Sequence, residues 1–487
     1  MNQSLCPDSS LIPHPFSNPA IRVVKKSGAR WGAANKESGI RRVSAARRAA
    51  FEVLRRVEEE GTFAAALLAS ANGELRADDR ALCYELVLGV LRRQLWLDKL
   101  IEHYAGRPAE RLDAPVRRAL RLGLYQLRFL TRIPPSAAIN ESVNLVHEAR
   151  LRSAAGFINA VLRRVTREPD YDPATHAATE LERLALATSH PVWLLERWMK
   201  FFGAGETENF ARANNRTPHV AFRVNLLRAG GAEVIERLSA AGIELKPSLI
   251  AQEAWRIEGT GGKAASPLLR ELADEGAIYL QDEASQLIAG ALDARAGERV
   301  LDVCAAPGSK TTGIAARAGD RTFVVAGDKY GHRLRTLRES AARQGLENIQ
   351  AIVYDAEAAP LPFAAGSFER VLVDAPCTGT GTLRHNPEIR WRITPTDISE
   401  LAARQRRILA NAARTVAVGG RLVYSTCSIE PEENEEVVLA FLETHPAFKS
   451  IQPDVPEHLL TTDGAARTWP QRDDTDGFFV AVFSRKE

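Results

Sequence analysis

RVLDVCAAPGSKTT, residues 299–312, is the stretch that decides the fold of this chain. Residues 299–303 form a mostly apolar run that ends at turn residues, which is the pattern of a short buried strand. Pro307 and Gly308 break the strand, and a helix can start near Thr311. A strand that turns through small residues into a helix presents backbone N–H groups at the carboxyl end of the strand, where α/β sheets bind their ligands. The stretch therefore predicts a β–α unit with a ligand-binding turn.

Downstream of this stretch, short apolar runs alternate with helical patterns to the end of the chain. The predicted strands after the first are residues 322–327, 349–354, 370–374, 421–425 and 478–483. Helical patterns separate them, with one helix predicted over 398–416. This alternation is typical of a mostly parallel, doubly wound sheet. Residues 291–487 are therefore predicted to form an α/β domain.

Three segments precede this domain. Residues 1–40 are rich in Ser, Pro, Asn, Gly and Lys without periodicity, which predicts a flexible basic tail. Residues 41–170 show apolar side chains at helical spacing and short connections, so an all-α bundle is expected, with one helix over 79–104. Its excess of Lys and Arg is compatible with a polyanionic partner. Residues 171–290 are predicted to be a helical linker and a small α+β, RRM-like subdomain with strands near 219–225, 255–257 and 277–280.

Composition narrows the class of protein. With 487 residues, 45% hydrophobic and 26% charged, the chain is expected to be globular with several domains. No run approaches the roughly 20 apolar residues of a membrane helix, and no signal peptide is visible, so we expect no membrane partner. The five cysteines are scattered and lack a C-x-x-C pair, which argues against a disulfide framework and a zinc site. We therefore expect no metal, and a place in the reducing cytoplasm.

Four aspartates stand at or just after the ends of predicted strands: Asp302, Asp328, Asp355 and Asp374. Carboxylates along this rim suit a ligand with hydroxyls and a positive charge. The turn matches neither G-x-G-x-x-G nor G-x-x-x-x-G-K-[ST], which argues against a dinucleotide and against a P-loop. S-adenosylmethionine fits better, with the acid after the second strand on the ribose and the acid after the third near the adenine amino group.

Several motifs then carry a resemblance to known families. DVCAAPGSKT, GDKY, YDA, DAPCTGTGTLRHNPEIRWR and YSTCSIEPEENE resemble, in this order, the motifs of the RNA 5-methylcytosine methyltransferases. RRALRLGLYQLRFL, IPPSAAINESVNLVHEA and FINAVLRRV resemble the helical RNA-binding domain of NusB. Residues 42–487 thus resemble the small-subunit ribosomal-RNA cytosine-C5 methyltransferases that carry a NusB-like domain. The resemblance implies a class I methyltransferase (Rossmann-like) sheet, ribosomal RNA as partner and S-adenosylmethionine as cofactor.

The resemblance also implies the residues of the cofactor site. They are Cys304, Ala305, Ala306, Pro307, Gly308, Ser309, Lys310, Asp328, Asp355 and Asp374. Ser309 stands where the family usually has a second glycine. If that position needs a positive φ, serine is strained there and the loop is slightly reshaped. Cys304 is expected to serve chiefly as a packing residue.

Two cysteines carry the expected chemistry. Cys377 and Cys427 each follow a predicted strand, and in a class I methyltransferase the first, fourth and fifth strands lie side by side, about 5 Å apart. A thiolate that adds to C6 of cytosine makes C5 nucleophilic enough to attack a methyl group. The residues alone do not choose between the two thiols. The resemblance assigns Cys427 as the nucleophile and Cys377 to product release, and Asp374 is placed to protonate N3 of the base.

RNA contacts are predicted just after Cys377. The basic and aromatic residues there are Arg384, His385, Arg390, Trp391 and Arg392. The target base must be single-stranded or flipped out, because a stacked cytosine cannot offer C6. The acidic residues 430–436 are interpreted as a solvated helix start that binds no metal.

The sequence thus predicts a monomeric, cytoplasmic RNA cytosine-C5 methyltransferase that acts on small-subunit ribosomal RNA. Transfer RNA is the alternative substrate, and a non-catalytic RNA-binding or assembly factor is the alternative of another class.

Overall fold

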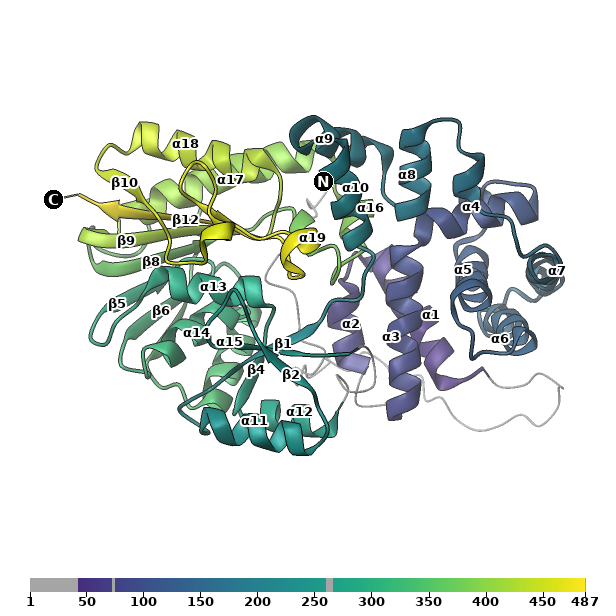
Figure 1. The fold of residues 1–487 in the computed structure, drawn as a ribbon, viewed down its shortest axis with the longest axis horizontal. Coiled ribbons are helices and arrows are strands. Elements are labelled where there is room, and N and C mark those ends of the chain that lie inside the picture. Colours follow the sequence, from purple (N-terminus) through teal and green to yellow (C-terminus); the bar gives the residue numbers. More distant parts are fainter. Residues whose placement is uncertain (1–42, 72–74, 260–265, 487) are drawn as a thin grey trace. The chain divides into compact units, whose positions relative to one another are not determined.

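A computed structural model describes residues 43–71, 75–259 and 266–486 of the chain. The tail predicted for residues 1–40 lies outside these ranges. The described residues divide into two compact units, with the boundary between residues 201 and 202 (Figure 1). In the described ranges, no helix is both long enough and apolar enough to cross a lipid bilayer.

Among its described residues, the first unit contains helices and no strand, as predicted. Its helices are α1 (Ala45–Glu60), α2 (Ala64–Ala71), α3 (Ala77–Arg92), α4 (Gln94–Ala105), α5 (Ala114–Phe129), α6 (Pro135–Glu148), α7 (Ala155–Arg167), α8 (Glu180–Thr188) and α9 (Val192–Phe202). The apolar faces of α1 and α3 to α7 meet in one core that contains Leu54, Leu86, Leu97, Leu120 and Leu162. Helical periodicity in the sequence therefore corresponds to the buried face of each helix.

The single helix predicted over residues 79–104 is wrong, because the chain breaks at Arg93 into α3 and α4. Arg93 leaves the helical region, with φ −112° and ψ 14°. The hydroxyl of Ser189 accepts a hydrogen bond from the backbone N–H of Leu95 at 2.9 Å, and Arg93 donates to the carbonyl of Ala187 at 3.1 Å. The break is thus stabilised by a segment 94 residues away, which apolar periodicity does not reveal.

After α10 (Ala204–Ala213), the second unit begins with a small four-stranded subdomain. It consists of β1 (Val220–Val224), α11 (Gly231–Ala240), β2 (Leu245–Pro247), β3 (Ala254–Ile257), α12 (Pro267–Asp274) and β4 (Ile278–Leu280). The strands are antiparallel in the order β2-β3-β1-β4, and α11 and α12 bury their apolar sides against one face. This β-α-β-β-α-β arrangement is ferredoxin-like and confirms the predicted RRM-like subdomain. β2 was missed because it is three residues long and partly exposed.

The large sheet confirms the predicted α/β domain. Its strands are β5 (Arg299–Asp302), β6 (Phe323–Asp328), β7 (Ile349–Val353), β8 (Phe368–Asp374), β9 (Val416–Thr426), β10 (Phe448–Ile451), β11 (Ala466–Arg467) and β12 (Phe479–Arg485). The order is β10-β12-β9-β8-β5-β6-β7, and β11 pairs with β12. β5 to β9 are parallel, whereas β12 runs antiparallel to both of its main neighbours. The first, fourth and fifth strands of the domain, β5, β8 and β9, therefore lie side by side as expected.

Helices cover both faces of this sheet (Figure 1). They are α13 (Glu283–Leu292), α14 (Ser309–Arg317), α15 (Gly331–Gln344), α17 (Pro395–Ala413) and α18 (Glu435–Thr444), with the short α16 (Ile389–Arg392) and α19 (Pro470–Asp473). One core packs α17 and α18 against the sheet, and another packs α13 and α14 against it. The sheet is therefore buried on both sides, which is why its strands read as continuous apolar runs.

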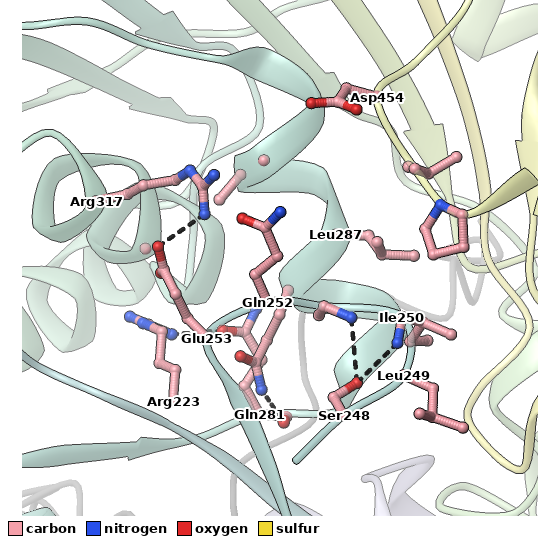
Figure 2. Close-up of a pocket in the computed structure, with 17 residues that line it drawn as sticks. Arg223, Ser248, Leu249, Ile250, Gln252, Glu253, Gln281, Leu287, Arg317 and Asp454 are labelled. Atoms are coloured by element: carbon pink, nitrogen blue, oxygen red, sulfur yellow. Dashed lines mark hydrogen bonds and ion pairs between the residues drawn. The ribbon is translucent and has the colours of Figure 1, made fainter. Parts of the chain in front are cut away.

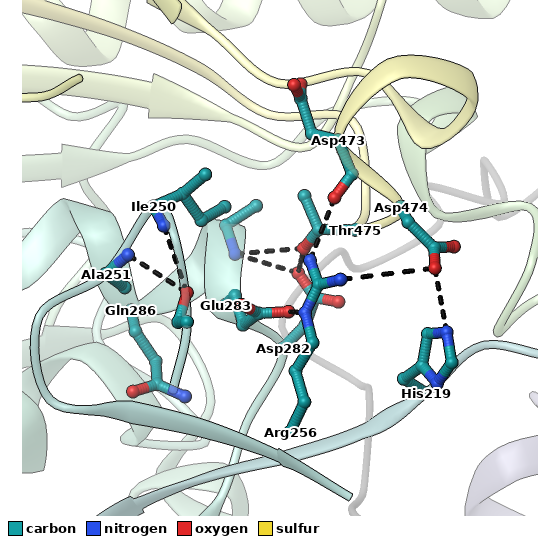
Figure 3. Close-up of polar contacts among 12 residues, drawn as sticks. His219, Ile250, Ala251, Arg256, Asp282, Glu283, Gln286, Asp473, Asp474 and Thr475 are labelled. Carbon is teal, nitrogen blue, oxygen red and sulfur yellow. Dashed lines mark hydrogen bonds and ion pairs between the residues drawn. The ribbon is translucent and has the colours of Figure 1, made fainter. Parts of the chain in front are cut away.

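Polar contacts join the small subdomain to the large sheet's domain. Arg256 of β3 forms an ion pair with Glu283 of α13 and donates to the backbone carbonyl of Asp473 at 2.8 Å (Figure 3). His219, just before β1, lies 2.7 Å from a carboxylate oxygen of Asp474. Between the two parts lies a cavity of about 350 Å³, which Arg223 and the Glu253–Arg317 ion pair help to line (Figure 2). The small subdomain is thereby held close to the chain segment that precedes β12.

Candidate active site

The structure brings the two predicted cysteines together. Cys377 follows β8 and Cys427 follows β9, and these parallel strands pair in a register that sets Asp374 opposite Ser425. Both thiols are buried, and their sulfur atoms lie 3.4 Å apart. Two thiols from neighbouring strand ends therefore share one site at the carboxyl edge of the sheet.

Two glycines allow the loops around these cysteines to pack closely. Gly381 donates its backbone N–H to the carbonyl of Cys427 at 2.9 Å, and Gly477 donates to the carbonyl of Gly381 at 2.8 Å. A Cβ on Gly381 would lie only 2.0 Å from the carbonyl oxygen of Gly477 and 2.8 Å from that of Cys427. Glycine is required at position 381 because backbone approaches it from two sides.

A buried ion pair lies at the same edge. Lys310 Nζ is 2.7 Å from Asp374 Oδ2, and the hydroxyl of Ser425 donates to Asp374 Oδ1 at 2.8 Å. Burial alone would lower the pKa of Lys310, but the charge and hydrogen bond of Asp374 outweigh it and raise the pKa, with a smaller contribution from Cys427. Lys310 is therefore protonated at neutral pH, and its positive charge interacts with both Asp374 and Cys427.

The turn after β5 has the shape expected of a ligand cradle. Gly308 has φ +110°, and a Cβ there would come within 2.7 Å of Leu337 Cγ. Ser309 is the first residue of α14 and is not among the described residues with positive φ, so serine at this position is not strained. Cys304 is partly buried against the core under the sheet, and burial raises the pKa of its thiol well above the usual value, which fits a packing role.

The predicted acids lie along the edge of the sheet. Asp302 Oδ2 accepts from Thr311 at 2.7 Å, its Oδ1 has no hydrogen-bond partner within the described ranges, and burial raises the pKa of Asp302 to about 7. Asp328 ends β6 and lies 3.2 Å from Arg333. Asp355, after β7, lies 2.8 Å from Lys329, whose hydrogen bond lowers the pKa of this acid. An unused buried acceptor and a row of carboxylates fit a cationic ligand that carries hydroxyls.

The predicted RNA-binding cluster is used in part within the protein. Arg384 is buried and binds the carboxylate of Asp474 at 2.6 Å. Arg390 is fully buried and donates to Asn215 at 3.1 Å. His385, Trp391 and Arg392 are each half-buried. RNA contact through this cluster remains a prediction. The side chains of the cluster that stay accessible to RNA are those of His385, Trp391 and Arg392.

Acids that the sequence did not single out surround His385. Its Nδ1 lies 2.9 Å from Asp476, and one ligand atom each of Asp282, His385 and Asp476 falls within 4.8 Å of the others. Asp282 also accepts from the hydroxyl of Thr475 at 2.7 Å. Burial would lower the pKa of His385, but the neighbouring carboxylates raise it. No local signal could have found this group, because its members are about 100 to 200 residues apart in the sequence.

The acidic stretch 430–436 corrects a sequence-based interpretation. Its residues were expected to be solvated, yet Glu430 and Glu433 are fully buried. Glu433 ends a short 3₁₀ turn (Pro431–Glu433) between β9 and α18, and burial raises the pKa of its carboxyl group to about 7. The reason is tertiary: Thr378 of the Cys377 loop and Gln405 of α17 donate hydrogen bonds to this carboxylate, and Ser428 of its own loop adds a third donor residue. Charge in the sequence does not reveal such partners.

This strand order, with the glycine turn after the first strand and acids along the carboxyl edge, defines a class I methyltransferase. Residues 289–484 match the family "16S rRNA methyltransferase RsmB/F", residues 44–167 match the NusB family, and residues 190–262 match the ferredoxin-like domain of RsmF/B-like methyltransferases.

Similarities over the full length of related proteins agree with these family matches. The chain is 35% identical over 446 residues to a probable ribosomal RNA small subunit methyltransferase B of Bacillus subtilis, covering 90% of this chain and 98% of the relative. A namesake from Yersinia pseudotuberculosis is 34% identical over 440 residues, with the same coverage. The crystal structure of the protein PH0851 superposes with a TM-score of 0.78 at 31% identity, covering 91% of this chain and 100% of that one. The chain belongs to the RsmB/F family of 16S rRNA methyltransferases. It is an rRNA methyltransferase, and S-adenosylmethionine is its methyl donor.

Proposed function

We propose that this chain methylates C5 of a specific cytidine in small-subunit ribosomal RNA through a covalent bond between Cys427 and C6 of the base. The observation that carries the proposal is the pair of buried thiols 3.4 Å apart, next to the Lys310–Asp374 ion pair. Methyl transfer to an oxygen or an exocyclic nitrogen needs no thiol, whereas transfer to a pyrimidine carbon needs a nucleophile to activate the ring.

S-adenosylmethionine supplies an electrophilic methyl group when it is bound. Residues 304–310 would cradle it from the turn after β5, with Asp374 at the neighbouring strand end. Asp328 would accept from the ribose hydroxyls, as it ends the second strand of the sheet. Asp355 would accept from the adenine amino group, as it follows the third. Arg333 must share Asp328 with the ribose, because the two side chains already lie 3.2 Å apart.

Each residue has a role in the balanced reaction. The Cys427 thiolate forms the S–C6 bond, the electrons of the C5–C6 double bond pass toward N3, and N3 takes a proton from the Asp374–Lys310 pair. C5 would then take the methyl group from bound S-adenosylmethionine, whose methyl–sulfur bond would break and leave its electrons on a neutral thioether sulfur. A base removes the C5 proton, the C5–C6 double bond forms again, N3 returns its proton, and the C6–S bond breaks with its electrons on Cys427. Cys377 lies near enough to Cys427 to assist this last step and release the product.

Substitution of each cysteine tests the proposal. Cys427→Ala should abolish methyl transfer, because no nucleophile then activates the base. Cys377→Ala should permit transfer but trap the protein–RNA adduct, visible as a shifted band on a denaturing gel. Cys83→Ala is the control, because Cys83 is buried in α3 of the other unit. An adduct with Cys427→Ala and none with Cys377→Ala would reverse the two roles.

The substrate is tested separately. Bisulfite sequencing of ribosomal RNA from a deletion strain should show one small-subunit cytidine that has lost its protection. Labelled methyl transfer to purified transfer RNA, with none to ribosomal RNA, would overturn this part of the proposal.

A further inference from the structure

Glu433 connects the two cysteine loops through its carboxylate. Oε1 accepts hydrogen bonds from the backbone N–H of Thr378 at 2.9 Å and from the side-chain amide of Gln405 at 2.9 Å. Oε2 accepts from the hydroxyl groups of Thr378 and Ser428. The two hydroxyls also lie 3.1 Å from each other. One carboxylate therefore collects four donors from three segments of the chain.

Two of the residues that donate these hydrogen bonds lie next to the two cysteines in the sequence. Thr378 directly follows Cys377, and Ser428 directly follows Cys427. Gln405, from α17, also donates to the carbonyl of Pro376, the residue before Cys377. The carboxylate thus fixes the backbone after Cys377 directly and the backbone before it through Gln405. It also holds the side chain of Ser428, the residue after Cys427.

A buried carboxylate needs hydrogen-bond donors for both of its oxygens. Glu433 is fully buried, and an ionised carboxylate without partners in that position would be costly. Charge-assisted hydrogen bonds to all its donors offset that cost and are stronger than neutral ones. Burial raises the pKa of Glu433 to about 7, while the hydrogen bonds from Ser428, Thr378 and Gln405 act in the opposite direction.

We propose that Glu433 is a positioning residue that holds the two cysteine loops in the register where their thiols lie 3.4 Å apart. This inference rests on the proposed cysteine chemistry. Glu433 acts through Thr378 and Ser428, because its oxygens are occupied by those residues and by Gln405.

Two substitutions separate positioning from chemistry. In Glu433→Gln the amide oxygen can accept from the Thr378 N–H and from Gln405, while the amide NH₂ donates to the two hydroxyls, which rotate to accept. The register is kept, so the single-turnover rate of methyl transfer should stay within about fivefold of the parent. Glu433→Ala removes every bond, and a misplacement of about 1 Å should lower that rate about 100-fold. The KM for S-adenosylmethionine should stay within about twofold in both, because the effect falls on kcat.

Glu436→Ala is the matched control, because Glu436 is an exposed acid in the first turn of α18. It should leave the rate and the thermal unfolding temperature unchanged. If Glu433→Ala fails to fold, Ser428→Ala and Thr378→Val each remove one hydroxyl contact and should each slow transfer, with their effects less than additive because both act through Glu433.

The adduct assay distinguishes failure of this inference from failure of the proposed function. Cys377→Ala with Glu433 intact should form the RNA adduct, and no adduct there refutes the cysteine mechanism itself. If that adduct forms and Glu433→Ala in the same background forms it at an unchanged rate, Glu433 does not position the thiols. If Glu433→Gln is as inactive as Glu433→Ala while both bind S-adenosylmethionine normally, the charge takes part in the reaction and the positioning role is refuted.

Discussion

Gly381→Ala is the substitution that tests the packing beneath the nucleophile. Gly381 lies in a short 3₁₀ turn (Thr380–Thr382) after Cys377. The atoms a new Cβ would meet are the backbone of Gly477 and Cys427, which cannot move aside as a flexible side chain can. The methyl group must therefore displace the loop that carries Cys427 or the segment that leads into β12.

The size of the displacement follows from the contacts. A Cβ 2.0 Å from the carbonyl oxygen of Gly477 must move away by at least about 1 Å, and a misplacement of that size at a reacting group costs about 100-fold in rate. Overpacking of this kind also destabilises a fold by about 1–3 kcal/mol. We expect kcat to fall about 100-fold, with a stability loss too small to unfold the domain.

Single-turnover transfer of labelled methyl to a ribosomal RNA transcript measures the rate, and urea unfolding measures the stability. Gly290→Ala is the matched control, because Gly290 lies inside α13 with no atom within 4 Å of its would-be Cβ. Alanine there should leave the rate unchanged and stabilise the helix by about 0.5–1 kcal/mol. An active Gly381→Ala variant, within about threefold of the parent, would refute the claim that backbone packing at Gly381 sets the position of Cys427.

Three further predictions concern the cofactor edge. Lys310→Met should lower the free energy of unfolding, measured in urea, by about 3–5 kcal/mol, because Asp374 is left as a buried unpaired charge. Adding Asp374→Asn should recover much of this loss, and equal losses in the single and double variants would contradict the ion pair. Burial raises the pKa of Asp302 to about 7, so its contribution to stability is full below about pH 4 and is lost as the pH rises through 7. Asp302→Asn should therefore gain stability relative to the parent between about pH 4 and pH 7 and level off above that, and a pH-independent difference would count against this assignment. Gly308→Ala, with φ +110° and a Cβ 2.7 Å from Leu337, should weaken S-adenosylmethionine binding at least about tenfold in calorimetry, and unchanged affinity would exclude this turn from the site.

Local patterns predicted most of the fold because periodicity reports burial directly. The apolar run before Asp302 and those of the next four parallel strands became β5 to β9, and Gly61, with φ +66°, ends α1 where the helical pattern stops. β11 was missed because two residues give no pattern, and β10 because the exposed Lys449 and Ser450 interrupt its apolar residues. The break at Arg93 was missed because its cause, Ser189, is distant in the sequence.

The candidate site divides in the same way. The sequence by itself determined which residues stand at strand ends: the acids, the glycine turn and both cysteines. Once the strand order was known, the two cysteines were expected to lie close together. Only the tertiary structure decided the partners, namely Asp374 for Lys310, Asp474 for Arg384, and Thr378 and Gln405 for Glu433. A side chain's position along a strand is a local property, whereas burial and hydrogen-bond partners depend on segments that meet only after the chain has folded.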